Sequence, residues 1–120
     1  MTSPTQLSLK ELRKRGYMAA VVEKFNPFVK VRQDLFGIID IIAVHPTKKE
    51  VLGVQATTDT GGNASKHKMK VAGNKNLQTW GDSGCKFAIW AWAKKGKARK
   101  RKLWILREVE LDDAAKYQTN

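Results

Sequence analysis

An aspartate interrupts the most apolar segment of the chain. Residues 37–44 read Gly-Ile-Ile-Asp-Ile-Ile-Ala-Val, a composition typical of a buried β-strand, with Asp40 in its middle. Burying an ionised carboxylate is costly unless a cation or hydrogen bonds compensate for it. Asp40 therefore has a structural role, pairing with a lysine or capping a turn, or it projects from a strand end and binds a divalent cation. This segment alone leaves both interpretations open.

The segments around Asp40 alternate between helical and extended patterns. Ser3-Pro4 is a typical helix start and Gly16 a typical helix end. We expect helices over residues 3–16 and 65–80, and strands over 17–25, 29–31, 37–44, 51–56, 87–93 and 103–109. In the second helix, Met69 and Leu77 are predicted to face the core. This order predicts one α/β domain over residues 1–120, with helices on the faces of a sheet and a frayed tail after about residue 111.

The charge of the chain indicates an anionic partner. Lys and Arg total 23 against 11 acids, a net charge of +12, and nucleic acids are the commonest partners of such a field, ahead of anionic membranes. No apolar run reaches the ~20 residues that span a bilayer, and the first residues lack the pattern of a secretory signal. The single cysteine, Cys85, cannot form an internal disulfide. We therefore expect a cytoplasmic protein that binds nucleic acid and no membrane.

Two groups of basic residues are candidates for nucleic-acid binding. Residues 94–102 contain seven basic residues and predict an exposed turn that contacts a phosphate backbone and releases counterions. Nearby, Trp90, Trp92 and Trp104 alternate on strands, either packing in the core or stacking on unpaired bases. The candidate binding residues are Lys66 and Lys70 on the second helix, and Lys94, Lys95, Lys97, Arg99, Lys100 and Arg101 in the turn.

Two further acids are candidates to join Asp40. Asp34 lies six residues earlier, and Gly37 between them allows the backbone to bend. Glu23 lies on the preceding predicted strand. The three acids could converge on one cation, whereas the simpler interpretation of Glu23 is a surface pair with a lysine.

From Leu12 to about Trp104 the chain resembles the PD-(D/E)XK nuclease superfamily, and within it the small Holliday junction resolvases of archaea and phages. The resemblance depends on Gly16-Tyr17 before a valine strand, on Asp40-Ile41-Ile42-Ala43, on Val54-Gln55-Ala56-Thr57, and on the helix and aromatic strand that follow. It implies a restriction-endonuclease-like fold, in which a mixed central β-sheet is flanked by helices. It also implies a Mg²⁺- or Mn²⁺-dependent endonuclease that acts on branched DNA as a homodimer, because a four-way junction needs two symmetric cuts.

The resemblance assigns Asp40 to the metal, but the partner strand departs from the family pattern. Where the family has an acid, an apolar residue and a lysine, this chain has Gln55, Ala56 and Thr57. A glutamine oxygen can bind a metal but brings no charge, and threonine cannot supply an ammonium group. For the family's helix glutamate the nearest candidate is Glu11.

Three compensations are open. Asp34 or Glu23 could supply the missing carboxylate, the carbonyl of Ala56 could be a ligand as in the family, and Lys66 or Lys70 could replace the lysine. The pattern Arg32-x-Asp34-Leu35-Phe36-Gly37 is similar to a phage-type subgroup. We expect Asp40, Gln55 and the Ala56 carbonyl to lie together at a solvent-facing edge of the sheet. The alternatives are a non-enzymatic nucleic-acid binder of the same fold, with Asp40 structural, and a ribosome-associated RNA-binding protein.

Overall fold

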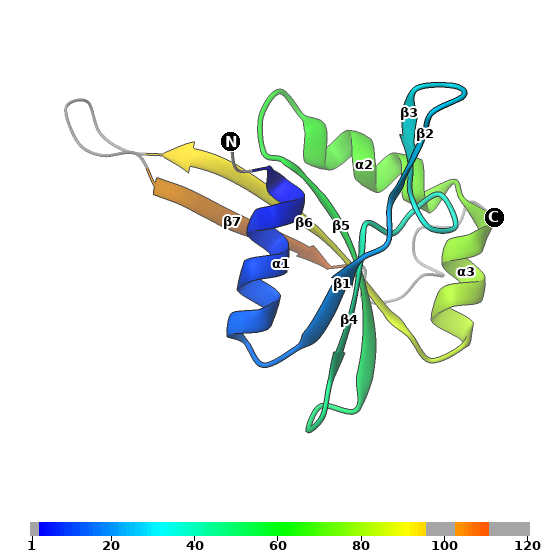
Figure 1. The fold of residues 1–120 in the computed structure, drawn as a ribbon, viewed down its shortest axis with the longest axis vertical. Coiled ribbons are helices and arrows are strands. Elements are labelled where there is room, and N and C mark those ends of the chain that lie inside the picture. Colours follow the sequence, from blue (N-terminus) through cyan, green and yellow to red (C-terminus); the bar gives the residue numbers. More distant parts are fainter. Residues whose placement is uncertain (1–2, 96–102, 111–120) are drawn as a thin grey trace.

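The computed structural model describes residues 3–95 and 103–110, which form a mixed α/β fold (Figure 1). Its elements in chain order are α1 (Pro4–Lys14), β1 (Met18–Val21), β2 (Lys24–Asn26), β3 (Val31–Gln33), β4 (Ile41–His45), β5 (Glu50–Thr58), α2 (Asn63–Ala72), α3 (Lys75–Asp82), β6 (Lys86–Lys95) and β7 (Leu103–Glu110). Five strands form the central sheet in the order β1-β4-β5-β6-β7, and β2 and β3 form a separate two-stranded sheet.

The central sheet is mixed because one of its strand pairs is parallel. β4 pairs with β1 and β5 in antiparallel fashion, and β6 pairs with β7 in the same way. β5 and β6 are parallel, with Gln55 opposite Ile89. Parallel neighbours need a crossover connection, and α2 and α3 supply it. The predicted α/β sheet with flanking helices is therefore confirmed.

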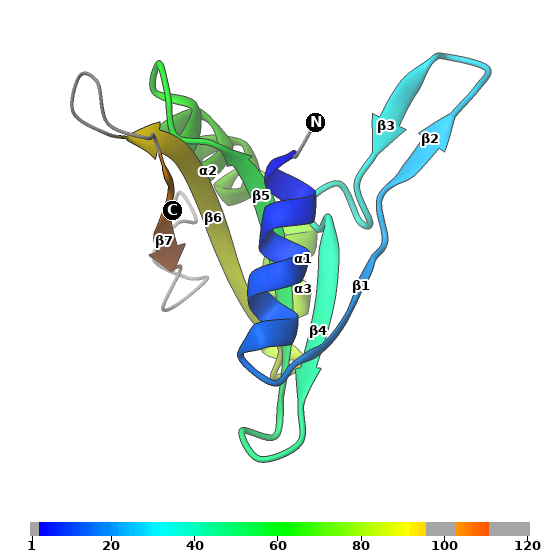
Figure 2. The ribbon, with the colours of Figure 1, turned by 60° about the vertical axis from the view of Figure 1, so that its left-hand side comes forward.

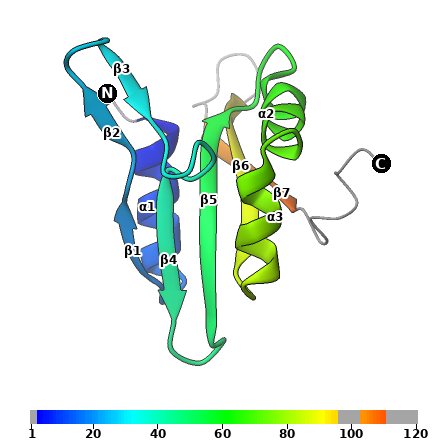
Figure 3. The same ribbon diagram turned by 90° about the vertical axis from the view of Figure 1, so that its right-hand side faces the viewer.

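Helices cover both faces of the sheet (Figure 3). The sheet therefore has a separate core cluster on each face. On the α1 side, Leu12 packs with sheet residues that include Trp90 and Trp92. On the α2–α3 side, Val71 and Leu77 pack with Ile38, Ile39, Phe87 and Ile89. Trp90 and Trp92 are thus core residues, which confirms the packing interpretation for these two. No helix among the described residues is long and apolar enough to cross a membrane.

The single helix predicted over residues 65–80 is wrong, because two helices occupy this stretch. The first begins at Asn63, and the second begins after Asn74, whose side chain accepts a hydrogen bond from the Asn76 N–H. The break interrupts the helical period, so Met69 does not share a face with Leu77. Leu77 is buried as predicted, whereas Met69 is 76% exposed.

Several predicted strands have different bounds in the structure. The strand expected over 29–31 is replaced by a turn over residues 27–30 followed by β3 at Val31–Gln33. The strand expected over 17–25 divides at Val22-Glu23, after which the chain leaves the central sheet and forms the β2–β3 hairpin (Figure 2). The strand expected over 37–44 begins only at Ile41. Before it, Phe36 and Gly37 adopt left-handed backbone conformations, with φ of 56° and 77°, and turn the chain. Asp40 consequently lies directly before a strand and not in its middle.

Part of the predicted basic turn lies outside the described residues. This part contains Lys97, Arg99, Lys100 and Arg101. The predicted frayed tail after residue 111 also lies outside the described residues. Lys94 and Lys95 are the last residues of β6 and are exposed. The ammonium group of Lys94 lies 5.2 Å from the centre of the Trp104 ring.

Candidate metal centre

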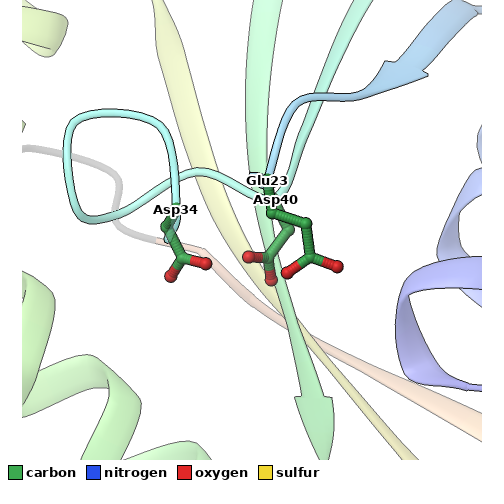
Figure 4. A group of neighbouring side chains, drawn as sticks. All are labelled: Glu23, Asp34 and Asp40. Carbon is green, nitrogen blue, oxygen red and sulfur yellow. The ribbon is translucent and has the colours of Figure 1, made fainter. Parts of the chain in front are cut away.

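Three acidic side chains from separate segments meet at one point beside the central sheet (Figure 4). Glu23, Asp34 and Asp40 each offer a carboxylate oxygen within 4.8 Å of the other two. Glu23 lies between β1 and β2, Asp34 directly follows β3, and Asp40 directly precedes β4. The three residues are named the acid cluster below. Of the two interpretations that the sequence left open, convergence of both Asp34 and Glu23 on Asp40 is the one observed, and the ion pair of Glu23 is with Arg32 and not with a lysine.

Asp40 is fixed to both neighbouring strands by its own backbone. Its N–H donates to the Val54 carbonyl at 2.9 Å, and its carbonyl accepts from the Val22 N–H at 2.8 Å. Its side-chain Oδ2 accepts a hydrogen bond from the Ala56 N–H at 2.8 Å. The expectation that Asp40 faces solvent is wrong, since the residue is only 4% exposed. Glu23 and Asp34 meet it there because the chain turns back after β3 and brings the hairpin base against the start of β4.

Gln55 joins the cluster from β5 and has a buried oxygen without a partner. Its Nε2 donates to Asp34 Oδ2 at 2.6 Å. Its Oε1 has no hydrogen-bond partner among the residues that the structure describes, although the side chain is only 2% exposed. A buried acceptor left unpaired costs about 1–3 kcal/mol. The Gln55 amide thus borders the acid cluster, and the carboxylate oxygens of the cluster are ligands that fit a divalent metal.

Ala56 and Thr57, the next two residues of β5, follow Gln55 beside the acid cluster, and Ala56 contacts Asp40 as expected. The Ala56 N–H donates to Asp40 Oδ2, on the side of β5 that faces β4. The N–H and carbonyl of a strand residue point to the same neighbouring strand, so the Ala56 carbonyl is also on this side of β5. Thr57 follows Gln55 on the same face of the strand and is 7% exposed. Thr57 brings no positive charge to the site.

Two cationic side chains border the acid cluster. Lys70 Nζ, from α2, lies 3.8 Å from Asp34 Oδ2, and Arg32 Nη1, from β3, lies 3.2 Å from Glu23 Oε1. Lys70 was one of the predicted replacements for the missing lysine, and Lys66 is exposed one turn earlier on the same helix. Arg32 was missed as a site residue, although its spacing of two from Asp34 is the strand period that places both on one face.

The first helix contributes a threonine and not an acid. Thr5 Oγ1 donates to Glu23 Oε1 at 3.4 Å. Glu11, the predicted candidate on this helix, instead forms an ion pair with Arg15 at 2.8 Å. Glu23 therefore occupies the side of the cluster that faces α1.

The surroundings of Asp40 favour its protonated form. Burial raises the pKa of Asp40 from 3.8 to about 8, with further increases from a hydrogen bond with Asp34 and from the negative charges of Asp34 and Glu23. The Ala56 N–H acts in the opposite direction. Without a cation, the cluster therefore keeps a proton on Asp40 at neutral pH, and a bound cation would displace it.

In the presence of a chelator, we expect the free energy of unfolding to decrease as the pH rises from about 4 to about 8. Over this range folded Asp40 retains a proton that the unfolded chain, with a pKa of 3.8, has lost. Each pH unit then lowers stability by up to ~1.4 kcal/mol, and the dependence ends above the folded pKa. Urea unfolding at several pH values measures it. Asp40→Asn should flatten the profile, and an unchanged profile would show that Asp40 is ionised in the metal-free protein.

Comparisons with protein-family models, with curated proteins and with solved structures found no match to this chain.

Proposed function

We propose that this chain is a metal-dependent, structure-selective endonuclease that hydrolyses phosphodiesters in branched DNA in the cytoplasm, like the Holliday junction resolvases it resembles. The observation that carries the proposal is the convergence of Glu23, Asp34 and Asp40, against which the buried Gln55 side chain lies. Three carboxylates at one largely buried point repel one another, and a divalent cation would relieve this repulsion. The net charge of +12 favours a polyanionic substrate.

The sheet supports a restriction-endonuclease-like fold as part of the same proposal. Asp40 precedes β4, and Gln55 and Ala56 lie on its antiparallel neighbour β5, the arrangement that the resemblance implies for the metal-binding hairpin. A parallel strand, β6, then follows the helices.

Oxygen atoms of five residues would hold the metal. They are the carboxylates of Glu23, Asp34 and Asp40, Oε1 of Gln55 and the carbonyl of Ala56. Such hard oxygen ligands suit Mg²⁺ or Mn²⁺. When bound, the metal would polarise a phosphoryl oxygen and lower the pKa of a water molecule. The acids Glu23 and Asp34 thus replace the charge that Gln55 lacks.

Lys70 would supply the ammonium group that the family's lysine provides and that Thr57 lacks. Its side chain is 59% exposed and reaches Asp34 from α2, so it can accompany a phosphate that enters beside the cluster. Lys70→Ala should lower kcat about 100-fold, a typical loss when one charge-stabilising group is removed. Lys75→Ala, which removes an exposed lysine of α3, is the matched control and should cut like the wild type. Equal rates for both variants would remove Lys70 from the mechanism.

Cleavage of a labelled four-way junction tests the proposal. With Mg²⁺ or Mn²⁺ we expect symmetric nicks near the branch, little cutting of a linear duplex of the same sequence, and no cutting in EDTA. Light scattering should show a homodimer, because two symmetric nicks need two active sites. Junction binding without any metal-dependent cutting would support the second candidate, a DNA-binding protein of the same fold that does not cut. Thr57 in place of a lysine is the observation that favours this candidate.

A further inference from the structure

The β2–β3 hairpin, residues 24–33, exposes apolar side chains that serve no core. Among the residues that the structure describes, its two strands pair only with each other, and the hairpin stands away from the central sheet (Figure 2). Neither core cluster includes a side chain from it. The exposed fractions are 59% for Phe25, 94% for Phe28, 59% for Val29 and 49% for Val31. A two-stranded hairpin gains little stability from exposed apolar groups, which makes this surface a candidate for binding.

The charge of the hairpin identifies the kind of partner. Residues 24–33 include Lys24, Lys30 and Arg32 and no acid. Apolar and aromatic groups surrounded by cations suit single-stranded or unstacked nucleic acid, which offers base faces next to phosphates. A symmetric contact between two copies of the hairpin would instead bring six cations together, which is unfavourable.

One face of the hairpin is continuous with the acid cluster. Phe25 pairs with Arg32 across the two strands, so both side chains lie on the same face. Glu23 directly precedes β2 and Asp34 directly follows β3, so both acids lie at the base of the hairpin. The contact of 3.2 Å between Arg32 and Glu23 agrees with this arrangement. The hairpin therefore begins and ends at two of the proposed metal ligands.

Given the proposed function, we propose that the β2–β3 hairpin recognises the branch point of the DNA. With a phosphate of the cut strand at the acid cluster, Arg32 contacts a neighbouring phosphate and Phe28 stacks on a base left unpaired at the branch. Phe28 follows Glu23 by five residue steps, a reach of at most about 16 Å at ~3.3 Å per residue. This corresponds to about five base steps of ~3.4 Å, so the cut should lie within that distance of the branch.

Binding of a four-way junction and of a matched linear duplex, with Ca²⁺ in place of Mg²⁺, tests this proposal. Stacking on one base is worth ~1–3 kcal/mol, so Phe28→Ala should weaken junction binding by about 5- to 150-fold. Duplex binding should change less than about twofold, because phosphate contacts dominate it. Phe28→Trp should retain junction binding, and a fluorescent 2-aminopurine at the branch should be quenched by the wild type but not by Phe28→Ala.

Met18→Ala is the matched control, because Met18 is 75% exposed but lies on β1 outside the hairpin. It should bind the junction like the wild type. An unchanged urea midpoint for Phe28→Ala would show that the fold is intact, as the position of Phe28 outside both cores predicts. Equal loss of junction binding in the two variants would overturn the role of the hairpin.

Failure of this inference can be distinguished from failure of the proposed function. If the wild type cuts with Mg²⁺ but Phe28→Ala still prefers junction over duplex, the hairpin does not recognise the branch and the nuclease proposal stands. If Phe28→Ala loses the preference but the wild type never cuts, the hairpin inference stands and the nuclease proposal fails. A dimeric wild type that becomes monomeric with Phe28→Ala would overturn the inference, because the hairpin would then be a contact between two copies.

Discussion

Asp40→Asn should abolish metal-dependent cleavage and, at the same time, stabilise the metal-free protein. Asparagine keeps an acceptor for the Ala56 N–H and offers a donor to Asp34, so it imitates the protonated aspartate that the cluster favours. It cannot provide a charged ligand, and the loss in rate should be about 1,000-fold or more. With a folded pKa of about 8, the gain in unfolding free energy at pH 8 should be at least about 2 kcal/mol.

Junction cleavage and urea unfolding in EDTA measure the two effects of Asp40→Asn. Asp82→Asn is the matched control, because Asp82 is an exposed acid at the end of α3. It should change neither quantity. Full activity of Asp40→Asn would place the metal elsewhere, and a loss of stability would show that the Asp40 carboxylate has a structural role.

Gln55→Glu should make the stability of the protein depend on a divalent cation. The amide of Gln55 donates to Asp34 Oδ2 at 2.6 Å, so a glutamate would place a fourth carboxylate against the acid cluster. In EDTA the uncompensated buried charge should cost about 3–5 kcal/mol. Mn²⁺ or Mg²⁺ should recover this lost stability. The cation should also bind Gln55→Glu more tightly than it binds the wild type, because the variant adds a negative charge at the site.

Thermal unfolding with and without the cation measures this effect. Gln78→Glu is the matched control, because the Gln78 amide donates at 2.7 Å to Asp82 on the surface of α3. This change should cost no more than ~0.5 kcal/mol and should be insensitive to metal. Adding Thr57→Lys to Gln55→Glu should raise the rate of cleavage by restoring the ammonium group. Equal stability of Gln55→Glu in EDTA and in Mn²⁺ would exclude a cation at this position.

The acid cluster could be anticipated from the sequence as one of two open interpretations, because its central residue conflicts with its surroundings. Asp40 among isoleucines needs compensation wherever it lies, and the only nearby acids before it are Asp34 and Glu23. The same argument could not predict that Asp40 is buried. Its exposure depends on the turn at Phe36 and Gly37 and on the hairpin base, which are tertiary features.

Helix boundaries and site cations were less predictable for a different reason. Asn74, between Ala72 and Lys75, can cap a new helix. The polar pattern nevertheless continues across this position, which is why Met69 was predicted to share a face with Leu77. Arg32 is exposed, and apart from its spacing of two residues from Asp34 its local pattern resembles that of other surface cations. Its approach to Glu23 depends on the pairing of β2 with β3, a register that the exposed hairpin sequence does not specify.

The separate pairing of β2 with β3 also affects how this chain could change during evolution. Residues 27–30 at the hairpin tip contribute to neither core, and the five-stranded sheet does not pair with them. Substitutions, insertions or deletions at the tip therefore leave the packing of the domain intact, and lengthening such a loop costs little entropy. By contrast, a change at Asp40 affects β1, β4 and β5 together. Among the described residues, the packing of the fold therefore leaves the tip free to diversify under selection for the DNA that Phe28 contacts, while the acids at its base are constrained by the whole sheet.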